Sequence, residues 1–232
     1  MQTIHRKTQL LHLKNALSVN YMKINSDASL LSNLKNIPDT QVASIAVCIQ
    51  KFNEARSLIA VTHRQYPIIP ESYFIQHKQE KSNNNKTPHF ERIVETVKME
   101  SEFKGIFQVE ALGLIEAIRC ARAELAANPE IKKIDFIVDN KSLADMSMTV
   151  LKQGNKLQPE QPAFRDISII ERELKLLRST FRGTSIKILF KHREFNKEAD
   201  RNASQAVKFA LDAVNSISED IHKKHEEEFR GF

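Results

Sequence analysis

The sequence predicts an α/β fold with a mixed five-stranded sheet, three antiparallel strands first and alternating helices and strands after them. Two observations support this. Three β-rich runs separated by short polar breaks occupy residues 21–66, and helical and strand-like segments alternate from about residue 105 onward. Short breaks favour antiparallel pairing, and alternation favours parallel strands joined by helices, so helices should flank the sheet.

The three leading strands are predicted at residues 21–30, 44–52 and 57–66. Apolar and polar positions alternate in YMKINSDASL, which is typical of a half-buried strand. SIAVCIQKF and SLIAVTHRQY are separated only by the turn-like NEAR, which predicts an antiparallel hairpin. The segment around NLKNIPD, between the first two strands, is predicted as a polar loop.

An insertion is predicted from residue 67 to about residue 104, before the first long helix. Its centre, KQEKSNNNKTP, is polar and rich in breakers, which predicts a loop tip or a disordered stretch. The flanks SYFIQHK and ERIVETVKME partly alternate and are candidates for a surface hairpin. Because its centre has little apolar content, we expect the insertion to be dispensable for folding but to affect substrate choice.

The second half of the chain alternates helices with strands. Helices are predicted at residues 109–127, 141–153, 164–182 and 196–215, and strands at residues 132–139 and 185–192. The main domain therefore spans residues 21–215. A basic lead-in, residues 1–20, precedes it as a helix or an organellar transit peptide, and a charged tail, residues 216–232, follows it.

Composition excludes some classes of protein. No run of apolar residues approaches the roughly 18 needed to span a membrane, so an integral membrane protein is not expected. The net charge of +6 and the pI near 9.2 favour a polyanionic partner. Cys48 and Cys120 lie in apolar contexts without metal-ligand spacing or a nearby histidine, so both are predicted to be buried free thiols. Free thiols indicate a reducing compartment, and the cytoplasm is the expected location.

Four acidic residues occupy positions typical of a metal centre at the end of a sheet. Asp27 lies inside the first strand, where aspartate is disfavoured, and Asp139 ends an apolar strand. Glu110 and Asp200 each lie in the predicted first turn of a helix. Clustered carboxylates hold divalent cations that activate water for phosphodiester hydrolysis. Taken singly, each acid also fits a structural role as a helix-dipole partner, cap or turn residue.

Four segments of the chain resemble the ribonuclease H family, in particular its reverse-transcriptase-like plant and bacterial branch. They are KINSDASL, FQVEALGLIEAIRCA, KKIDFIVDNKSLADM and FKHREFNKEADRNASQA. The last is similar to the family's R-E-x-N-x-x-A-D-x-x-A signature, and DNKSLADM to its D-S-x-x-L-V segment. The resemblance covers about residues 21–66 and 105–212. It departs from the family in the long, Gly-poor segment after Asp27 and in the insertion.

The resemblance implies a ribonuclease H-like fold in which Asp27, Glu110, Asp139 and Asp200 are the catalytic, metal-binding carboxylates. The implied function is a metal-dependent endoribonuclease that hydrolyses the RNA strand of RNA–DNA hybrids, using two Mg²⁺ or Mn²⁺ ions. Alternatives are a nuclease of the same fold acting on another RNA or DNA, including a secreted bacterial effector, and a non-catalytic nucleic-acid-binding module. The oligomeric state is left open.

Nucleic-acid binding is predicted from basic side chains. Residues 164–182 carry several of them, and Arg172, Lys175 and Arg178 are candidates to contact phosphates, the alternative being a solvated helix face. Arg193, in the signature, is a candidate to contact phosphate or to brace the acids. Asn196 is predicted to cap the last helix. His192 lies beside the position of the family's mobile-loop histidine, with a surface residue at a strand end as the alternative.

Overall fold

The computed structural model describes residues 18–34, 37–71, 80–84, 89–99 and 102–230. Within these ranges, the side chains of Asn33 and of residues 37–39, 80–84, 89 and 219–230 are not described. Most of the predicted lead-in, residues 1–17, lies outside the described part of the chain. No described helix has the length and apolarity to cross a membrane.

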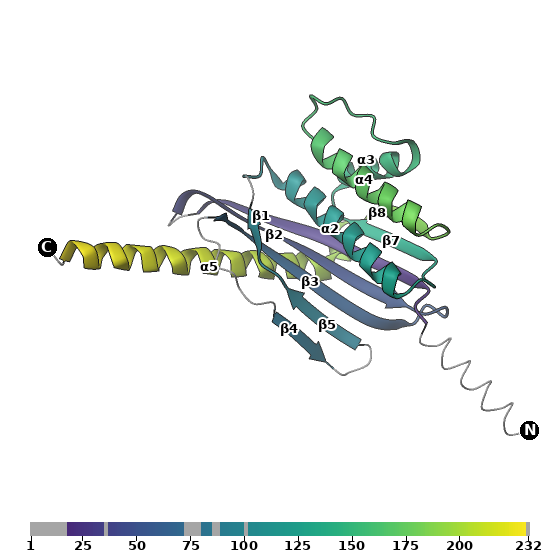
Figure 1. The fold of residues 1–232 in the computed structure, drawn as a ribbon, viewed down its shortest axis with the longest axis horizontal. Coiled ribbons are helices and arrows are strands. Elements are labelled where there is room, and N and C mark those ends of the chain that lie inside the picture. Colours follow the sequence, from purple (N-terminus) through teal and green to yellow (C-terminus); the bar gives the residue numbers. More distant parts are fainter. Residues whose placement is uncertain (1–17, 35–36, 72–79, 85–88, 100–101, 231–232) are drawn as a thin grey trace, which may run out of the picture.

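A mixed β-sheet forms the centre of the molecule (Figure 1). Its middle consists of three antiparallel strands, β1 (Tyr21–Leu34), β2 (Ile37–Phe52) and β3 (Leu58–Pro70). Strand β7 (Lys133–Val138) lies parallel to β1, and β8 (Ser185–Phe190) lies parallel to β7. These five strands, in the order β3-β2-β1-β7-β8, confirm the predicted ribonuclease H-like architecture.

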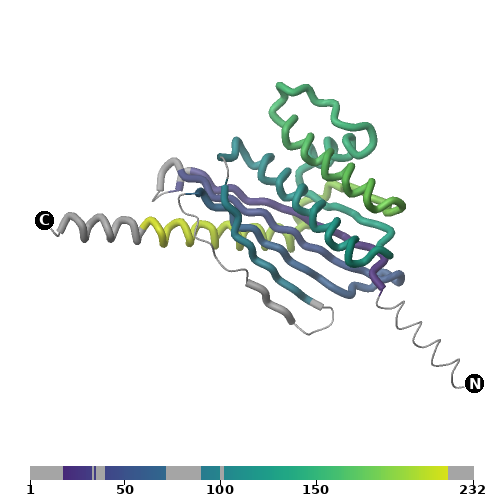
Figure 2. Tube along the Cα trace, in the orientation of Figure 1, coloured from purple at the N-terminus to yellow at the C-terminus, as the bar shows by residue number. Residues whose placement is uncertain are grey.

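The described residues of the predicted insertion contribute three more strands to the same sheet. They are β4 (Glu80–Asn84), β5 (His89–Val94) and β6 (Val97–Met99). Strands β5 and β6 both pair in parallel with β3, and Ile93 and Met99 are buried. Figure 2 shows the trace of residues 90–94 beside that of β3. The edge of β3 offers unpaired backbone groups, which β5 and β6 satisfy.

Strand β4 comes from the predicted loop centre and pairs antiparallel with β5, so part of this centre is strand rather than a loop tip. The flank SYFIQHK, predicted to pair with ERIVETVKME, lies outside the described residues. That the insertion is dispensable for folding stays a prediction.

The β1–β2 hairpin is longer than predicted. Residues 31–34 and 37–43, placed in a polar loop by the sequence, continue the antiparallel ladder, with Leu30 opposite Ala43 and Leu31 opposite Val42. Val42 is fully buried against the last helix, and Leu34 packs against the same cluster. This tertiary burial outweighs the polar local sequence, which is the usual reason that strand ends are mispredicted.

In the described part of the chain, four helices flank the sheet: α2 (Ile106–Ala127), α3 (Lys141–Gln153), α4 (Phe164–Thr180) and α5 (Lys197–Arg230). Helices α2 and α5 cover opposite faces of the sheet. Successive residues of a strand point to opposite faces, and the neighbouring residues Ser44 and Ile45 of β2 lie against different helices. The Ser44 hydroxyl donates to the Ala203 carbonyl of α5 at 2.7 Å, whereas Ile45 lies beside Gly113 of α2. Helix α4 packs on α2 and α3.

Helix α5 approaches the sheet closely because small residues repeat along its inner side: Ala199, Ala203, Ala206 and Ala210. Each of these alanines is buried, so the helix lies directly on β1, β2 and β3. The helix continues to Arg230 and projects past the strands (Figure 1). Residues 216–230 are therefore part of this helix rather than a separate tail.

Candidate active site

The four predicted acids lie on four different elements around one end of the sheet. Asp27 is in β1, Asp139 directly follows β7, and Asp200 is in the first turn of α5, as predicted. Glu110 is on α2, but this helix begins at Ile106, so the carboxylate is on the second turn and not the first. A structural role as a first-turn helix-dipole partner is thereby excluded for Glu110.

Strand register brings Asp27 and Asp139 to the same level. Strands β1 and β7 are parallel, and their last paired residues are Asn25 and Ile137. Each aspartate follows two residues later, so both lie just beyond the point where the pairing of β1 with β7 ends, although β1 itself continues to Leu34. Cross-strand pairing also places Asp27 beside Ala46, on the face of the sheet that α5 covers. Asp200 reaches the site from that helix.

Burial and mutual repulsion perturb these acids. Burial, followed by the negative charges of Asp139 and Asp200, raises the pKa of Asp27 to about 7, against the lowering effects of the Ala28 amide and Arg193. Burial also raises the pKa of Glu110 and of Asp139. Charge repulsion contributes in both cases, from Asp139 on Glu110 and from Asp200 on Asp139. The acids therefore act on one another as one electrostatic cluster.

One oxygen of the most buried acid has no protein partner. The Asp27 side chain is 5% exposed, and its Oδ1 accepts a hydrogen bond from the Ala28 amide at 2.8 Å. Its Oδ2 is buried and has no hydrogen-bond partner among the described residues. A buried carboxylate oxygen left in this way is costly unless a cation or a proton binds it.

Arg193 supplies positive charge to the whole cluster. Its Nε donates to Oδ1 of Asp200 at 2.6 Å, and its Nη2 donates to the same oxygen. The same guanidinium lowers the pKa of Asp27, Glu110 and Asp139. Of the two roles considered from the sequence, the structure shows bracing of the acids. The Arg193 side chain is 69% exposed, so solvent reaches this ion pair.

Two asparagines position elements of the site. Asn140 caps α3, since its Oδ1 accepts from the Leu143 amide at 3.0 Å, and its Nδ2 donates to Oε2 of Glu110. Neither role was predicted from the sequence. The cap could have been, since an asparagine just before a helix is a recognisable N-cap, whereas the contact with Glu110 depends on the tertiary structure. Asn196 precedes α5, but its fully buried side chain does not cap the helix as predicted. Its Nδ2 donates instead to the Ser26 carbonyl of β1 at 3.0 Å, which ties the start of α5 to the strand bearing Asp27.

The carboxylates are spread more widely than the ligands of a single ion. Among the described residues, the one group of three or more potential ligands whose atoms all lie within 4.8 Å of one another is Cys48, His63 and Glu198. The four predicted acids do not meet this criterion. Cys48 and Cys120 are buried free thiols, as predicted, but the expectation that no histidine is near Cys48 is wrong. The β2–β3 register pairs Cys48 directly with His63.

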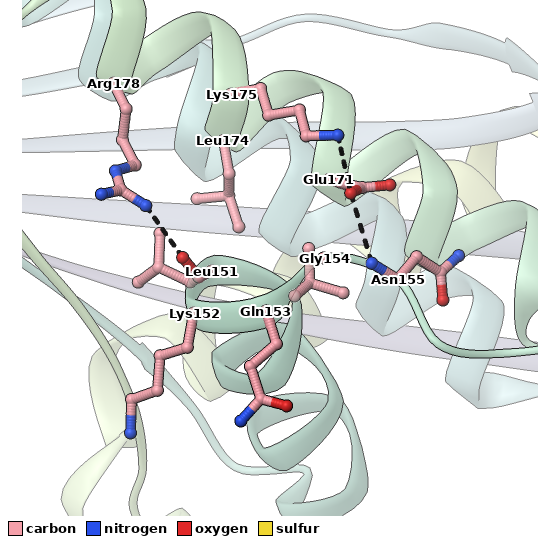
Figure 3. A pocket seen from close by; sticks show the side chains of 10 residues that line it. Leu151, Lys152, Gln153, Gly154, Asn155, Glu171, Leu174, Lys175 and Arg178 are labelled. Atoms are coloured by element: carbon pink, nitrogen blue, oxygen red, sulfur yellow. Dashed lines mark hydrogen bonds and ion pairs between the residues drawn. The ribbon is translucent and has the colours of Figure 1, made fainter.

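The predicted basic residues of α4 are all exposed, but only two of the three line the same groove. Lys175 and Arg178 line a groove of about 500 Å³ between α3 and α4 (Figure 3). Lys175 pairs with Glu171 at 2.8 Å, and Arg178 donates to the Leu151 carbonyl at 2.9 Å. Arg172 lies outside this groove lining and approaches Glu173 at 3.6 Å. His192 is exposed and contacts the edge of Phe190, with 5.0 Å between ring centroids.

The chain is similar in fold to several solved structures. It matches LC11-RNase H1, isolated from compost by a metagenomic approach, at 14% identity over 83% of this chain and 99% of that chain, with a TM-score of 0.46. It matches the RNase H domain of prototype foamy virus at 13% identity over 82% of this chain and 94% of that chain, with a TM-score of 0.46.

A foamy viral protease–reverse transcriptase in complex with an RNA/DNA hybrid matches at 12% identity over 83% of this chain and 20% of that chain, with a TM-score of 0.39. No family model and no curated protein matches the chain. The class of fold is ribonuclease H-like, which the strand order of this chain itself shows. At these identities and TM-scores, activity has to be inferred from the side chains of this protein.

Proposed function

We propose that the protein is a metal-dependent nuclease that hydrolyses the RNA strand of RNA–DNA hybrids. The observation that carries this proposal is the placement of Asp27 and Asp139 at equal levels on neighbouring parallel strands, with Glu110 and Asp200 interacting with them from separate helices. A purely structural role explains a cap or a turn at one position. It does not explain why the negative charges of Asp139 and Asp200 raise the pKa of acids that lie on other elements.

The residues present fit divalent magnesium or manganese. All four ligands are carboxylates, which are the hard oxygen donors that these ions prefer. The unpartnered Oδ2 of Asp27 and the raised pKa of that carboxyl show where positive charge would be most stabilising. A spread wider than 4.8 Å suits two ions, since paired metal sites have ions about 4 Å apart and share their ligands among both.

In the proposed mechanism, bound cations would supply an activated water and charge stabilisation for the leaving oxygen. The protein's part is to hold the ligands. Asp27 is fixed by the Ala28 amide, Glu110 by Asn140, and Asp200 by Arg193. Because Arg193 donates twice to one oxygen of Asp200, cation binding requires this ion pair to loosen or to share the carboxylate.

Binding of the nucleic acid is assigned to basic side chains. The exposed Lys175 and Arg178 flank one groove, and an extended phosphate backbone is the ligand that such a row of cations attracts. Discrimination of RNA would come from contacts to 2′-hydroxyl groups in a shallow minor groove. The long, Gly-poor β1–β2 hairpin after Asp27, where the sequence departs from the family, makes this substrate preference a point to test.

A non-catalytic nucleic-acid-binding module is the second candidate, and one observation favours it. The Arg193–Asp200 ion pair already neutralises one of the four carboxylates with a cation from the protein. A protein that had lost turnover could keep its acidic cluster in this internally paired state. This candidate predicts nucleic-acid binding that does not depend on divalent ions.

One experiment separates these candidates. Matched RNA–DNA hybrid, double-stranded RNA, single-stranded RNA and DNA are incubated with the protein in Mg²⁺, Mn²⁺ or chelator. We expect cleavage of the RNA strand of the hybrid with either ion and none with chelator. Cleavage of another substrate would change the assignment to a nuclease of different specificity. Binding without cleavage under every condition would support the non-catalytic module.

A further inference from the structure

A second cluster of potential metal ligands lies on the face of the sheet that α5 covers, and its chemistry differs from that of the four acids. Cys48 of β2 and His63 of β3 are directly paired across neighbouring strands, and Glu198 is on the first turn of α5 above them. Each offers one ligand atom, and these atoms all lie within 4.8 Å of one another. The Cys48 thiol donates to Oε2 of Glu198 at 3.3 Å.

Burial and hydrogen bonding leave the histidine incompletely satisfied. His63 is 5% exposed and Cys48 is 1% exposed, so both ligands are inside the protein. Asn202 of α5 lies 3.1 Å from Nδ1 of His63, whereas the buried Nε2 has no hydrogen-bond partner among the described residues. Burial lowers the pKa of His63, so the ring is neutral near pH 7. A neutral imidazole with one unpartnered nitrogen is the state in which histidine binds metals.

We propose that Cys48, His63 and Glu198 form a binding site for Zn²⁺ or a chemically similar transition-metal ion, separate from the carboxylate cluster. One sulfur, one nitrogen and one oxygen donor make a set that favours zinc over magnesium or calcium. Tetrahedral zinc would bring its ligand atoms to roughly 3.3–3.8 Å from one another, so ligand atoms now within 4.8 Å of one another would have to approach by at most about 1.5 Å. The exposed Glu198 gives an ion a route from solvent to the two buried ligands.

Binding has two chemical requirements. The thiol of Cys48 must release its proton to solvent, and burial together with Glu198 opposes this release, while Lys23 favours it. If Nε2 is the nitrogen ligand, the remaining ring proton must be on Nδ1. Nδ2 of Asn202 donates to the Glu198 carbonyl at 2.7 Å, and the same nitrogen faces Nδ1 of His63. The side-chain amide of Asn202 must therefore rotate by half a turn, so that its oxygen faces Nδ1 and accepts that proton. The other charges near His63 are those of Arg92 and Arg201.

The location gives the ion a structural consequence. Glu198 and the predicted catalytic Asp200 are both on the first turn of α5. An ion held between this turn and two strands would cross-link the start of α5 to the sheet, at the place where Gln50 also donates to Glu198 at 3.3 Å. Zinc is therefore expected to stabilise the fold without being required for the chemistry at the carboxylates.

Cobalt substitution tests the site directly, because a thiolate bound to Co²⁺ gives an intense near-ultraviolet charge-transfer band that carboxylates do not. The full chain, stripped with chelator, is titrated with Co²⁺ and then with Zn²⁺. We expect the band to appear with about one equivalent of Co²⁺ and to be displaced by Zn²⁺. Asp139→Asn should leave it intact, so failure here is distinguishable from failure of the proposed nuclease function.

Substitutions identify the ligands. Cys48→Ser should abolish the band, and Cys120→Ser, which alters the other buried free thiol, should retain it. Glu198→Gln, at an exposed ligand, should weaken Co²⁺ affinity by roughly 10-fold or more without unfolding the chain. No band in the wild-type chain, or a band that persists in Cys48→Ser, would overturn the proposal. Circular dichroism of each variant shows whether it is folded. If Cys48→Ser is unfolded, the Co²⁺ affinity of Glu198→Gln decides the test instead.

Discussion

The two clusters that share the first turn of α5 differ in donor chemistry and in how their charge is balanced. The acidic cluster uses only carboxylate oxygens and has a guanidinium, Arg193, beside it. The Cys48–His63–Glu198 cluster mixes sulfur, nitrogen and oxygen, and two of its three ligands are almost fully buried. Both include a residue from the first turn of α5. One helix turn can therefore contribute to two sites that select different ions.

The largest expected effect is loss of cleavage when a carboxylate is neutralised. Asp27→Asn and Asp139→Asn remove a ligand charge but almost no volume. Metal ions contribute several kcal/mol to such reactions, so cleavage of the RNA–DNA hybrid should fall at least about 10³-fold. Asp145→Asn, at an exposed acid of α3, is the matched control and should cleave normally. Near wild-type rates in either cluster variant would show that the acids are not catalytic.

A second effect is a dependence of stability on pH that arises from the acidic cluster. The pKa of Asp27 is raised from 3.8 to about 7, so between these values the folded chain holds a proton that the unfolded chain has released. Stability from this group is present below pH 4 and is lost as pH rises toward 7 and above. In chelator, the melting temperature should fall over this window, and Mg²⁺ should reduce the fall.

Variants distinguish this pH effect from other titrations. Asp27→Asn should flatten the dependence, whereas Cys48→Ser should leave the slope unchanged, because its cluster is separate. Thermal melts at several pH values, with and without Mg²⁺, measure both. The same slope in Asp27→Asn as in the wild-type chain would mean that other groups account for it.

A smaller effect is expected from the internal cation. Arg193→Gln removes the charge that competes with metal ions for Asp200. Exposed ion pairs contribute about 0–1 kcal/mol, so Mn²⁺ affinity should rise by at most about fivefold. Isothermal titration is the measurement, with Arg165→Gln on α4 as the control. Weaker binding in Arg193→Gln would indicate that Arg193 orders the ligands more than it opposes the ion.

The smallest effects are expected from the basic groove, which has neither cluster's ligands. Lys175→Ala and Arg178→Ala should each weaken hybrid binding and lower the slope of log affinity against log salt by about 1. Arg172→Ala, outside the groove lining, should change the slope less. Binding isotherms over a range of salt concentrations test this. A wild-type slope in all three variants would place the nucleic acid on another surface.

The sequence predicts the five central strands, the helices after them and the positions of the four acids, because hydrophobic periodicity and a family signature are local patterns. It does not predict features that depend on register. Cys48 and His63 are 15 positions apart and become neighbours only through the β2–β3 pairing. Residues 31–34 and 37–43 read as a loop but form strand, since Val42 is buried beneath a helix that begins more than 150 residues later.

The central claim is that the four acids form a hard-cation site independent of the sulfur-containing cluster. Calorimetric titration of Mn²⁺ into the wild-type chain, Asp139→Asn and Cys48→Ser tests it most directly. We predict that Mn²⁺ binds the wild-type chain and Cys48→Ser alike and binds Asp139→Asn at least about 10-fold more weakly. Unchanged Mn²⁺ binding in Asp139→Asn, or its loss in Cys48→Ser, would contradict the claim.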